Sequence, residues 1–374
     1  MTATEARLAR IRGRAVPRSH NARTIAALAS NPGCARRAIM DAAAVDKQRI
    51  AAYAGFPAPF GQSGFAFARG NAFEAQVKAS GGAELLALLR EHLNLPIPEA
   101  HYDDLSEVGG NASLDLRHAE TRNKLGRAAG DGTDRGTMFD HPLLRLEVGG
   151  RHAYLEPDLI AFQLNGKFHV IEIKSFAVID GHADSDKVAA AAIQSAVYVM
   201  ALRQALAELG VGPEAVADET ILVCPRDFSN RPVLARLDVR KQLTVLRRQL
   251  TRIARIDDLL ELLPPGLTFD LEPDEHGVPR RRPADLSAAI RAVDARYAPD
   301  CLNTCEMCFF CRDEARGCTA ALGRDAREDL GSVEHIATVL RLARGAGAPD
   351  DQAEAAALLR TAARLRADAL GEAV

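Results

Sequence analysis

Apolar and polar positions along the chain follow two different periods, and the change between them predicts an α/β protein. Over residues 22–45 and 69–91, apolar residues recur at the three- and four-residue spacing of helices. Residues 143–148, 152–163 and 167–174 instead form short strand-like runs, divided by Gly149-Gly150 and Asn165-Gly166. We expect these runs to form a β-meander.

The pattern after the meander predicts a helix over residues 186–208, a strand over 220–224 and a long helix over 235–263, which ends at a Pro-Pro-Gly sequence. Residues 115–140 are polar and lack periodicity, so we expect a long loop there. The chain then divides into three predicted segments. These are an N-terminal basic arm with a helical segment (1–59), a core (60–235) and a C-terminal helical region that contains a cysteine cluster (236–374).

Composition excludes several classes of protein. The 374 residues are 47% hydrophobic and 26% charged, which is typical of globular chains and argues against wholesale disorder. With 47 basic and 50 acidic residues, any nucleic-acid surface must come from local clustering. No uninterrupted apolar run of membrane-spanning length and no secretion signal is evident, so we expect a cytoplasmic protein. The arginine-rich first 23 residues fit either a solvated tail or contact with a phosphate backbone.

Three residues in the strand-like region form the central chemical motif. Asp158 follows Pro157 in one run, and Glu172 and Lys174 lie two residues apart in the next. Asp158 and Glu172 can supply the oxygen ligands that Mg²⁺ or Mn²⁺ prefers, and such a cation activates water for phosphodiester hydrolysis. The Lys174 ammonium can orient that water or stabilise negative charge. The alternative is an ordinary hairpin with scattered surface charges.

The connection between the two strands decides whether these side chains can meet. A plain two-residue turn would pair Leu164 with Lys167 and put Asp158 on the face opposite Glu172 and Lys174. A three-residue loop or one bulge would pair Leu164 with Phe168 and bring Asp158 opposite Lys174 on a shared face. The proposed chemistry therefore predicts an irregular hairpin, with Gly166 in a left-handed conformation.

Additional residues extend this candidate site. Gln194 and Tyr198 are four residues apart in the following helix, so they share a face that can bind phosphate or a base edge. Alternatively, Tyr198 is a core aromatic residue and Gln194 a helix-surface residue. Glu74 follows Gly70 near a helix start, where it could join the metal ligands or serve only as a first-turn helix acid.

These motifs together resemble the PD-(D/E)XK nuclease superfamily, and within it the RecB-like branch. The matching residues are Pro157-Asp158, Glu172-Ile173-Lys174 and Gln194-Ser195-Ala196-Val197-Tyr198. The resemblance implies a restriction-endonuclease-like core, in which a mixed sheet is flanked by helices, with N- and C-terminal helical segments wrapped around it. In that branch a histidine usually stands where this chain has Glu74, so the fourth metal contact is open.

Five of the seven cysteines fall between Cys301 and Cys318, and a cytoplasmic chain uses such a cluster for metal more often than for disulfides. Some RecB-like nucleases, including the AddB subunit and the nuclease family of CRISPR adaptation, hold a [4Fe–4S] cluster with one upstream and three downstream cysteines. The resemblance therefore implies ligation by Cys34, Cys301, Cys305 and Cys311. A second downstream triplet, made of Cys308, Cys311 and Cys318, fits the spacing about as well, and structural Zn²⁺ is the alternative metal.

The sequence thus predicts a metal-dependent deoxyribonuclease that acts as an exonuclease in DNA repair, recombination or phage defence. Its expected partner is DNA, with a helicase as a candidate second partner. Its competitors are a catalytically inactive DNA-binding or scaffold module, and a zinc-containing restriction-type endonuclease.

Overall fold

A computed structural model describes residues 2–58, 64–93, 101–106, 113–130, 137–149, 151–164, 167–227, 229–254 and 256–371. The chain forms two compact units. The first, here called the cysteine unit, comprises residues 1–17, 30–60 and 257–374, and the second, the sheet unit, comprises residues 18–29 and 61–256. The sheet unit therefore includes residues 18–29 and 236–256, which lie outside the core segment predicted from the sequence.

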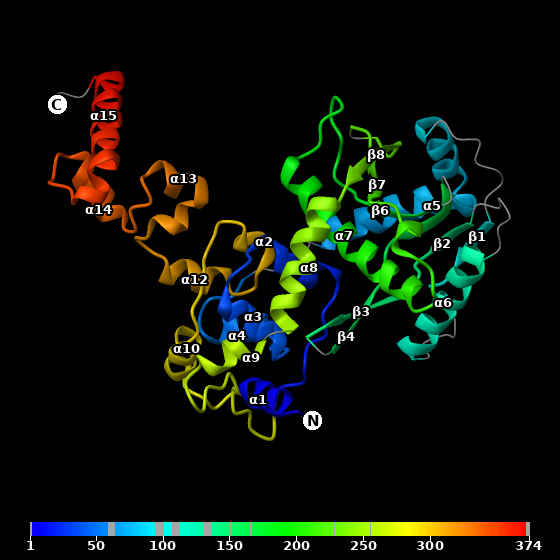
Figure 1. Cartoon of the computed structure of the whole chain (residues 1–374), viewed down its shortest axis with the longest axis horizontal. Coiled ribbons are helices and arrows are strands. Elements are labelled where there is room, and N and C mark those ends of the chain that lie inside the picture. Colours follow the sequence, from blue (N-terminus) through cyan, green and yellow to red (C-terminus); the bar gives the residue numbers. More distant parts are fainter. Residues whose placement is uncertain are drawn as a thin grey trace. The chain divides into compact units, whose positions relative to one another are not determined.

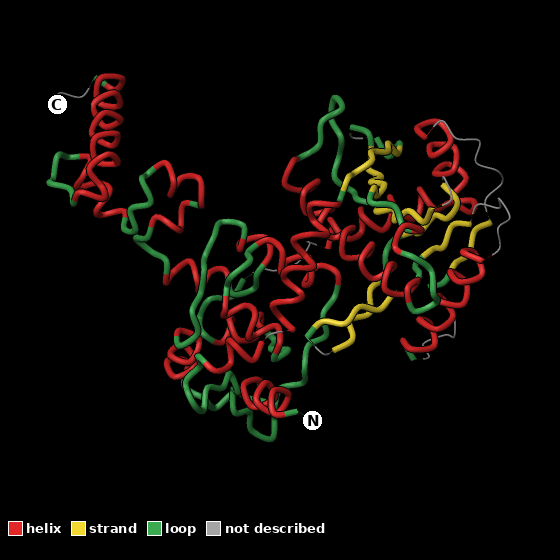
Figure 2. The backbone as a smooth tube through the Cα atoms, in the orientation of Figure 1, coloured by secondary structure: helices red, strands yellow, loops and turns green. Residues whose placement is uncertain are grey.

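A mixed six-stranded sheet forms the centre of the sheet unit (Figures 1 and 2), which confirms the predicted α/β class with helical flanks. The strand order is β1-β2-β5-β6-β7-β8, in which β2, β5 and β6 are antiparallel, β6 and β7 are parallel, and β7 and β8 are antiparallel. The strands are β1 (His101–Asp104), β2 (Thr137–Asp140), β5 (Leu159–Leu164), β6 (Lys167–Ile173), β7 (Glu219–Pro225) and β8 (Pro232–Asp238).

Helices cover both faces of this sheet because alternate strand residues are apolar on each side. On one face, Leu159, Ile171 and Ile173 form a buried cluster with Phe73 and Val77 of α5 (Gly64–Leu93). Helix α7 (Ser185–Ala207) connects the parallel strands β6 and β7 across the other face, where α8 (Arg240–Ala254) packs beside it. The helix predicted over residues 186–208 and the strand predicted over 220–224 are thus confirmed.

Helix α7 is also the only helix among the described residues that is long and apolar enough to cross a membrane, with a mean hydropathy of 1.2 over the most apolar window. More than half of that window, 56%, is buried inside the protein. Its apolar side chains are explained by packing against the sheet, so this helix is weak evidence for a membrane span.

The predicted meander is wrong in one respect. Residues 152–163 form two strands rather than one, because Glu156-Pro157-Asp158 interrupts them and Pro157 has no N–H to donate to a ladder. Strands β3 (Leu144–Val148) and β4 (Arg151–Leu155) pair as a separate two-stranded sheet, and only β5 and β6 belong to the main sheet.

The prediction of a long loop over residues 115–140 is also wrong. Helix α6 (Leu114–Gly130) occupies its first half, and β2 ends it. His118, Thr121 and Leu125 are buried at helical spacing, and His118 and Thr121 bond the carbonyl and N–H of Leu143. A helix whose buried face is largely polar gives little hydrophobic periodicity, which is why the pattern failed to predict it.

The predicted break within helix α5 is confirmed. The interruption predicted near Gly81-Gly82 is present in α5, where residues 79–82 leave the helical conformation and both glycines have positive φ. The helix predicted over 235–263 is wrong at its start, because β8 extends to Asp238, and α8 is followed by a separate helix, α9 (Ile256–Glu261).

The regular secondary structure described in the cysteine unit consists of helices, which irregular segments connect. The N-terminal residues form a helix, α1 (Ala3–Arg12), rather than a flexible arm, because Thr2 and Glu5 make a capping box. The remaining helices are α3 (Ala35–Ala42), α4 (Lys47–Tyr53), α10 (Pro283–Arg291), α11 (Cys301–Thr304), α12 (Cys308–Glu314), α13 (Arg324–Asp329), α14 (Ile336–Ala343) and α15 (Ala353–Leu370). Residues far apart in sequence meet here, since the Arg36 N–H donates to the Asp294 carbonyl at 2.8 Å.

Candidate active site and cysteine cluster

The β5–β6 hairpin is irregular, as the proposed chemistry required, but in a different register. Leu164 pairs with Lys167, whereas Ala161 pairs with His169 and Leu159 with Ile171, so one extra residue bulges from β5. The predicted pairing of Leu164 with Phe168, and of Asp158 with Lys174, is therefore wrong. The conformation predicted for Gly166 lies outside the described residues.

The bulge nevertheless places the carboxylates together. Continuing the Leu159–Ile171 register by one residue brings Asp158 opposite Glu172, so both side chains lie on the sheet face that α7 covers. Asp158 Oδ2 accepts a hydrogen bond of 2.6 Å from the backbone N–H of Ile173. Lys174 is two residues beyond Glu172 and lies on the same face. The three residues predicted to share a face do so.

Glu172 is the least accessible charged group of this site, with no solvent exposure. Its Oε1 forms an ion pair with Lys174, and within the described part of the chain its Oε2 has no hydrogen-bond partner. Burial and the nearby charge of Asp158 raise the pKa of Glu172 to about 8. Burial also raises the pKa of Asp158, whereas the two carboxylates hold the pKa of Lys174 above its usual value despite burial.

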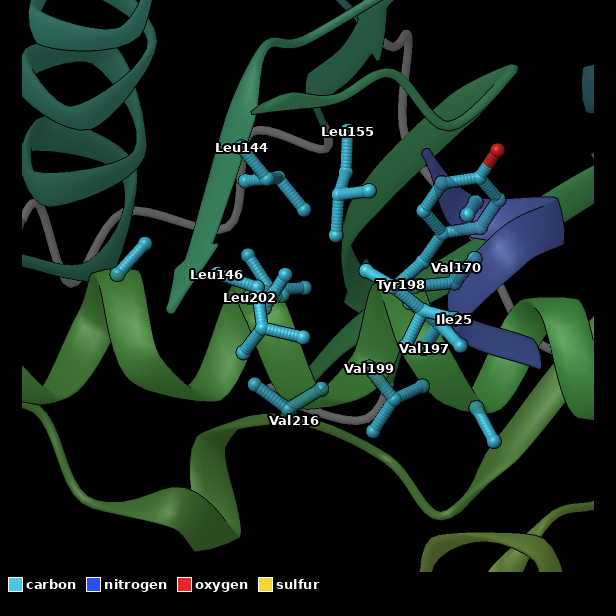
Figure 3. Close-up of a cluster of buried hydrophobic side chains, with 14 of the residues drawn as sticks. Ile25, Leu144, Leu146, Leu155, Val170, Val197, Tyr198, Val199, Leu202 and Val216 are labelled. Carbon is cyan, nitrogen blue, oxygen red and sulfur yellow. The ribbon is translucent and has the colours of Figure 1, made fainter. Parts of the chain in front are cut away.

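Gln194 and Tyr198 lie on the face of α7 that faces the carboxylates. The Gln194 amide donates to the Tyr198 hydroxyl at 3.1 Å. Burial raises the pKa of Tyr198 and the charges of Glu172 and Asp158 raise it further, which means that the phenol lies within electrostatic reach of both. Figure 3 shows the Tyr198 ring among apolar core residues with its hydroxyl at the edge of that group. Tyr198 is therefore a core aromatic residue whose polar end reaches the site.

Glu74 lies beside the same carboxylates, since its charge also raises the pKa of Asp158 and Glu172. It is held by two cationic groups, Lys78 Nζ at 2.5 Å and His141 Nε2 at 3.2 Å. Burial opposes ionisation of Glu74, but the hydrogen bonds from His141 and Lys78 lower its pKa to about 2. The predicted position near a helix start is wrong, because α5 begins at Gly64 and Glu74 lies ten residues into it, half-buried in this network.

Lys78, Asp140 and His141 complete this network and were not predicted from the sequence. Lys78 Nζ lies 2.6 Å from Asp140 Oδ1, and His141 Nδ1 lies 2.8 Å from the same oxygen. Hydrogen bonds to Asp140 and Glu74 raise the pKa of His141 to about 10. His141 also has a φ of +46° and donates its backbone N–H to the Asp158 carbonyl at 3.3 Å. An Asp-His-Pro sequence at a strand end was the available signal, but the strand itself was missed.

In the cysteine unit, residues 301, 305, 308 and 311 are buried, and Cys34 is half-buried at the start of α3, as its Asn-Pro-Gly break predicted. The thiol of Cys34 raises the pKa of both Cys301 and Cys311, after the larger effect of burial. Cys34 is therefore near the C-terminal cysteines. Cys318 differs from them, because its Sγ lies 3.9 Å from His335 Nδ1 in a bridge between residues 318 and 335.

Buried polar side chains approach two of these sulfurs. Arg36, with a side chain 3% exposed, donates to Cys311 Sγ at 3.2 Å and forms an ion pair with Glu314. The Asn31 amide donates to Cys301 Sγ at 3.2 Å. Burial raises the pKa of Cys311 to about 12, and Arg36 opposes this shift. Such donors favour the thiolate form that binds metal.

Neither site has metal-binding geometry as it stands. Across the residues that the structure describes, no group of three or more His, Cys, Asp or Glu side chains is close enough to hold an ion. The donor chemistry nevertheless fits a cation. The unpartnered Glu172 Oε2 beside Asp158 suits Mg²⁺, whereas buried thiols with N–H donors suit a thiolate-bound metal.

No family model matches the chain, and no curated protein matches it. Among solved structures, the crystal structure of SSO0001 is similar with a TM-score of 0.20 and 16% sequence identity, over 49% of this chain and 85% of that chain. At that TM-score the similarity supports no inference about fold or function.

Proposed function

We propose that the protein is a metal-dependent deoxyribonuclease of the PD-(D/E)XK type that acts in the cytoplasm. The observation that carries this proposal is a fully buried glutamate, Glu172, paired with Asp158 and Lys174 on one sheet face. Burying two carboxylates side by side is costly, and a purely structural role would more economically use apolar residues. The crowding of Glu172 and Asp158, which raises the pKa of Glu172, supports a cation-binding role.

Each residue then has a distinct role. Asp158 and Glu172 would hold Mg²⁺ or Mn²⁺, which supplies an activated water and neutralises charge on the scissile phosphate. Lys174, whose Nζ contacts Glu172 Oε1, would orient the water or stabilise the developing negative charge. Gln194 and Tyr198 would hydrogen-bond the substrate phosphate or a base edge, because their polar groups face the carboxylates.

Glu74 has two possible roles in this scheme. Its carboxylate could turn to the metal, or it could stay with Lys78 and His141 and position the site through the neighbouring Asp158 backbone. The observed ion pairs favour the positioning role.

For the cysteine unit we propose a [4Fe–4S] cluster held by Cys34, Cys301, Cys305 and Cys311, with structural Zn²⁺ as the alternative. The two sulfurs that accept buried N–H donors, those of Cys301 and Cys311, belong to this set. The contact of Cys318 with His335 argues against the triplet that includes Cys318. Iron and zinc content after anaerobic purification distinguishes the two metals.

The nuclease proposal is tested with Asp158→Ala, Glu172→Ala and Lys174→Ala, assayed for Mg²⁺-dependent cleavage of single-stranded and duplex DNA. Each should lose at least about 100-fold in cleavage rate and keep DNA binding, because the changes remove charge stabilisation at the reaction rather than spread phosphate contacts. Lys167→Ala, an exposed lysine on the same strand, is the matched control. Full activity in Asp158→Ala refutes the catalytic assignment, whereas binding by wild type without cleavage under any metal supports an inactive DNA-binding module.

A further inference from the structure

Helix α8 has two sharply different sides. Leu243, Leu246 and Ile253 are buried in the same core cluster as Tyr198 of α7. The opposite side is exposed and strongly basic. We call it the α8 basic face, and it consists of Lys241, Arg247, Arg248 and Arg252. The helix contains no aspartate or glutamate from residue 240 to residue 254.

The charges of this face are not neutralised by the fold. The first basic residue of the helix, Arg240, pairs with Asp238, and Arg203 of α7 pairs with Asp218. By contrast, no member of the α8 basic face forms an ion pair with any carboxylate that the structure describes. From residue 241 to residue 252 the helix rises roughly 17 Å, so the four unpaired positive charges are spread along most of its length.

We propose that the α8 basic face binds the phosphate backbone of DNA that occupies the carboxylate site. The inference rests on the proposed nuclease function. A chain with a net charge of −3 cannot attract DNA through its overall field, so a local cluster must supply the phosphate contacts. Arginine, which provides three of the four charges, binds phosphate through paired N–H donors.

The position of α8 supports this partner. Helix α8 packs directly against α7, the helix that presents Gln194 and Tyr198 to the carboxylates (Figure 1). A strand bound at that site can therefore continue over the same helical layer.

A membrane surface is the other polyanion that a basic amphipathic helix can bind. That mode requires the apolar side of the helix to enter the lipid. In α8 the apolar side is buried against α7 and β3, with Leu246 fully covered. Only the charged side is available, which favours nucleic acid.

The test is the quadruple variant Lys241→Gln, Arg247→Gln, Arg248→Gln and Arg252→Gln in the full-length protein. Binding of a fluorescent 20-nucleotide single strand and of the matching duplex is measured by anisotropy with Ca²⁺ in place of Mg²⁺, over a series of salt concentrations. A second variant replaces four arginines in or directly after α14 and in α15, namely Arg341, Arg344, Arg360 and Arg364, with glutamine and matches the change in net charge. Circular dichroism confirms that both variants fold.

We expect the α8 variant to bind DNA at least about tenfold more weakly at low salt. The slope of log K against log salt should become shallower by about 3, because each lost phosphate contact contributes about 0.7–0.9. The α14–α15 variant should bind as wild type does.

An unchanged slope in the α8 variant, with DNA binding and cleavage intact, overturns this inference and leaves the nuclease proposal standing. If the wild-type protein does not cleave DNA but the α8 variant still binds DNA more weakly, only the nuclease proposal is overturned. If the α8 variant instead loses binding to phosphatidylserine vesicles while binding DNA normally, the surface is a membrane site and the inference is overturned.

Discussion

Replacing Glu172 with glutamine should stabilise the metal-free protein, and the gain should increase with pH. The folded state raises the pKa of this carboxyl from 4.5 to about 8. Below pH 4.5 the side chain is protonated in both folded and unfolded states and contributes nothing to the pH dependence. Between pH 4.5 and 8 only the unfolded state loses its proton, so the free energy of unfolding falls as pH rises. The wild type therefore carries a cost at neutral pH that glutamine lacks.

The size of this effect follows from linkage. Each pH unit within that window costs about 1.4 kcal/mol, which gives a cost of about 3 kcal/mol at pH 7 and a limit of about 5 kcal/mol above pH 8. Because Glu172 is fully buried, solvent does not screen the effect. Glutamine must also bury an amide, but that cost does not depend on pH. The stability difference between variant and wild type should thus grow by about 3 kcal/mol from pH 5 to pH 7.

Urea unfolding followed by circular dichroism in EDTA at pH 5, 6, 7 and 8 measures this difference. Glu147→Gln removes the same charge from an exposed position on β3 and supplies the baseline. A difference that stays constant across this range, or that shrinks with pH, would refute the assignment of a desolvated carboxylate at Glu172. Adding Mg²⁺ should then stabilise the wild type and leave Glu172→Gln unaffected, since only the wild type keeps both carboxylates.

Two further predictions concern the cysteine unit. Cys34→Ala should lose bound iron and become protease-sensitive, because the proposed cluster joins α3 to the C-terminal cysteines, whereas Cys224→Ala, buried on β7, and Cys318→Ala should keep their iron. Arg36→Met should reduce the free energy of unfolding by about 3 kcal/mol, measured in urea, because it removes the partner of Glu314 from a partly buried ion pair and leaves the Val293 carbonyl without its donor.

A specific result would contradict each of these two predictions. Iron retained at wild-type level in Cys34→Ala would remove that residue from the ligand set, and stoichiometric zinc without iron would replace the iron–sulfur assignment. For the ion pair, Arg316→Met supplies the control, because Arg316 pairs with Asp313 at an exposed position where such pairs contribute less than about 1 kcal/mol. Equal losses in the two variants would contradict a special role for Arg36.

The chemical residues of the hairpin could be predicted from the sequence because strand alternation is a strict rule. Glu172 and Lys174 share a face whatever the loop does, and only Asp158 depended on the bulge. The position of that bulge could not be predicted. An extra residue in β5 and one in the loop both restore the shared face, so the alternation of polar and apolar positions does not distinguish them.

The network around Glu74 escaped prediction for a different reason. Lys78 is one helical turn beyond Glu74 and could have been noticed, but Asp140 and His141 enter the site from β2, which pairs with β5. Recognising them required knowing which strand neighbours the hairpin. Nonlocal strand order leaves little trace in a single sequence.

The discontinuity of the cysteine unit bears on how the chain is made. Its N-terminal part ends at residue 60 and its C-terminal part begins at residue 257, so about 200 residues separate the two. At ribosomal speeds of about 5–20 residues per second, α3 and Cys34 are synthesised roughly 10–40 s before the C-terminal residues that bury them. The sheet unit, whose main part is continuous from residue 61 to residue 256, can fold during that interval. Biosynthesis thus favours a sheet unit that forms first and a cysteine unit whose buried thiols come together only after most of the chain has emerged.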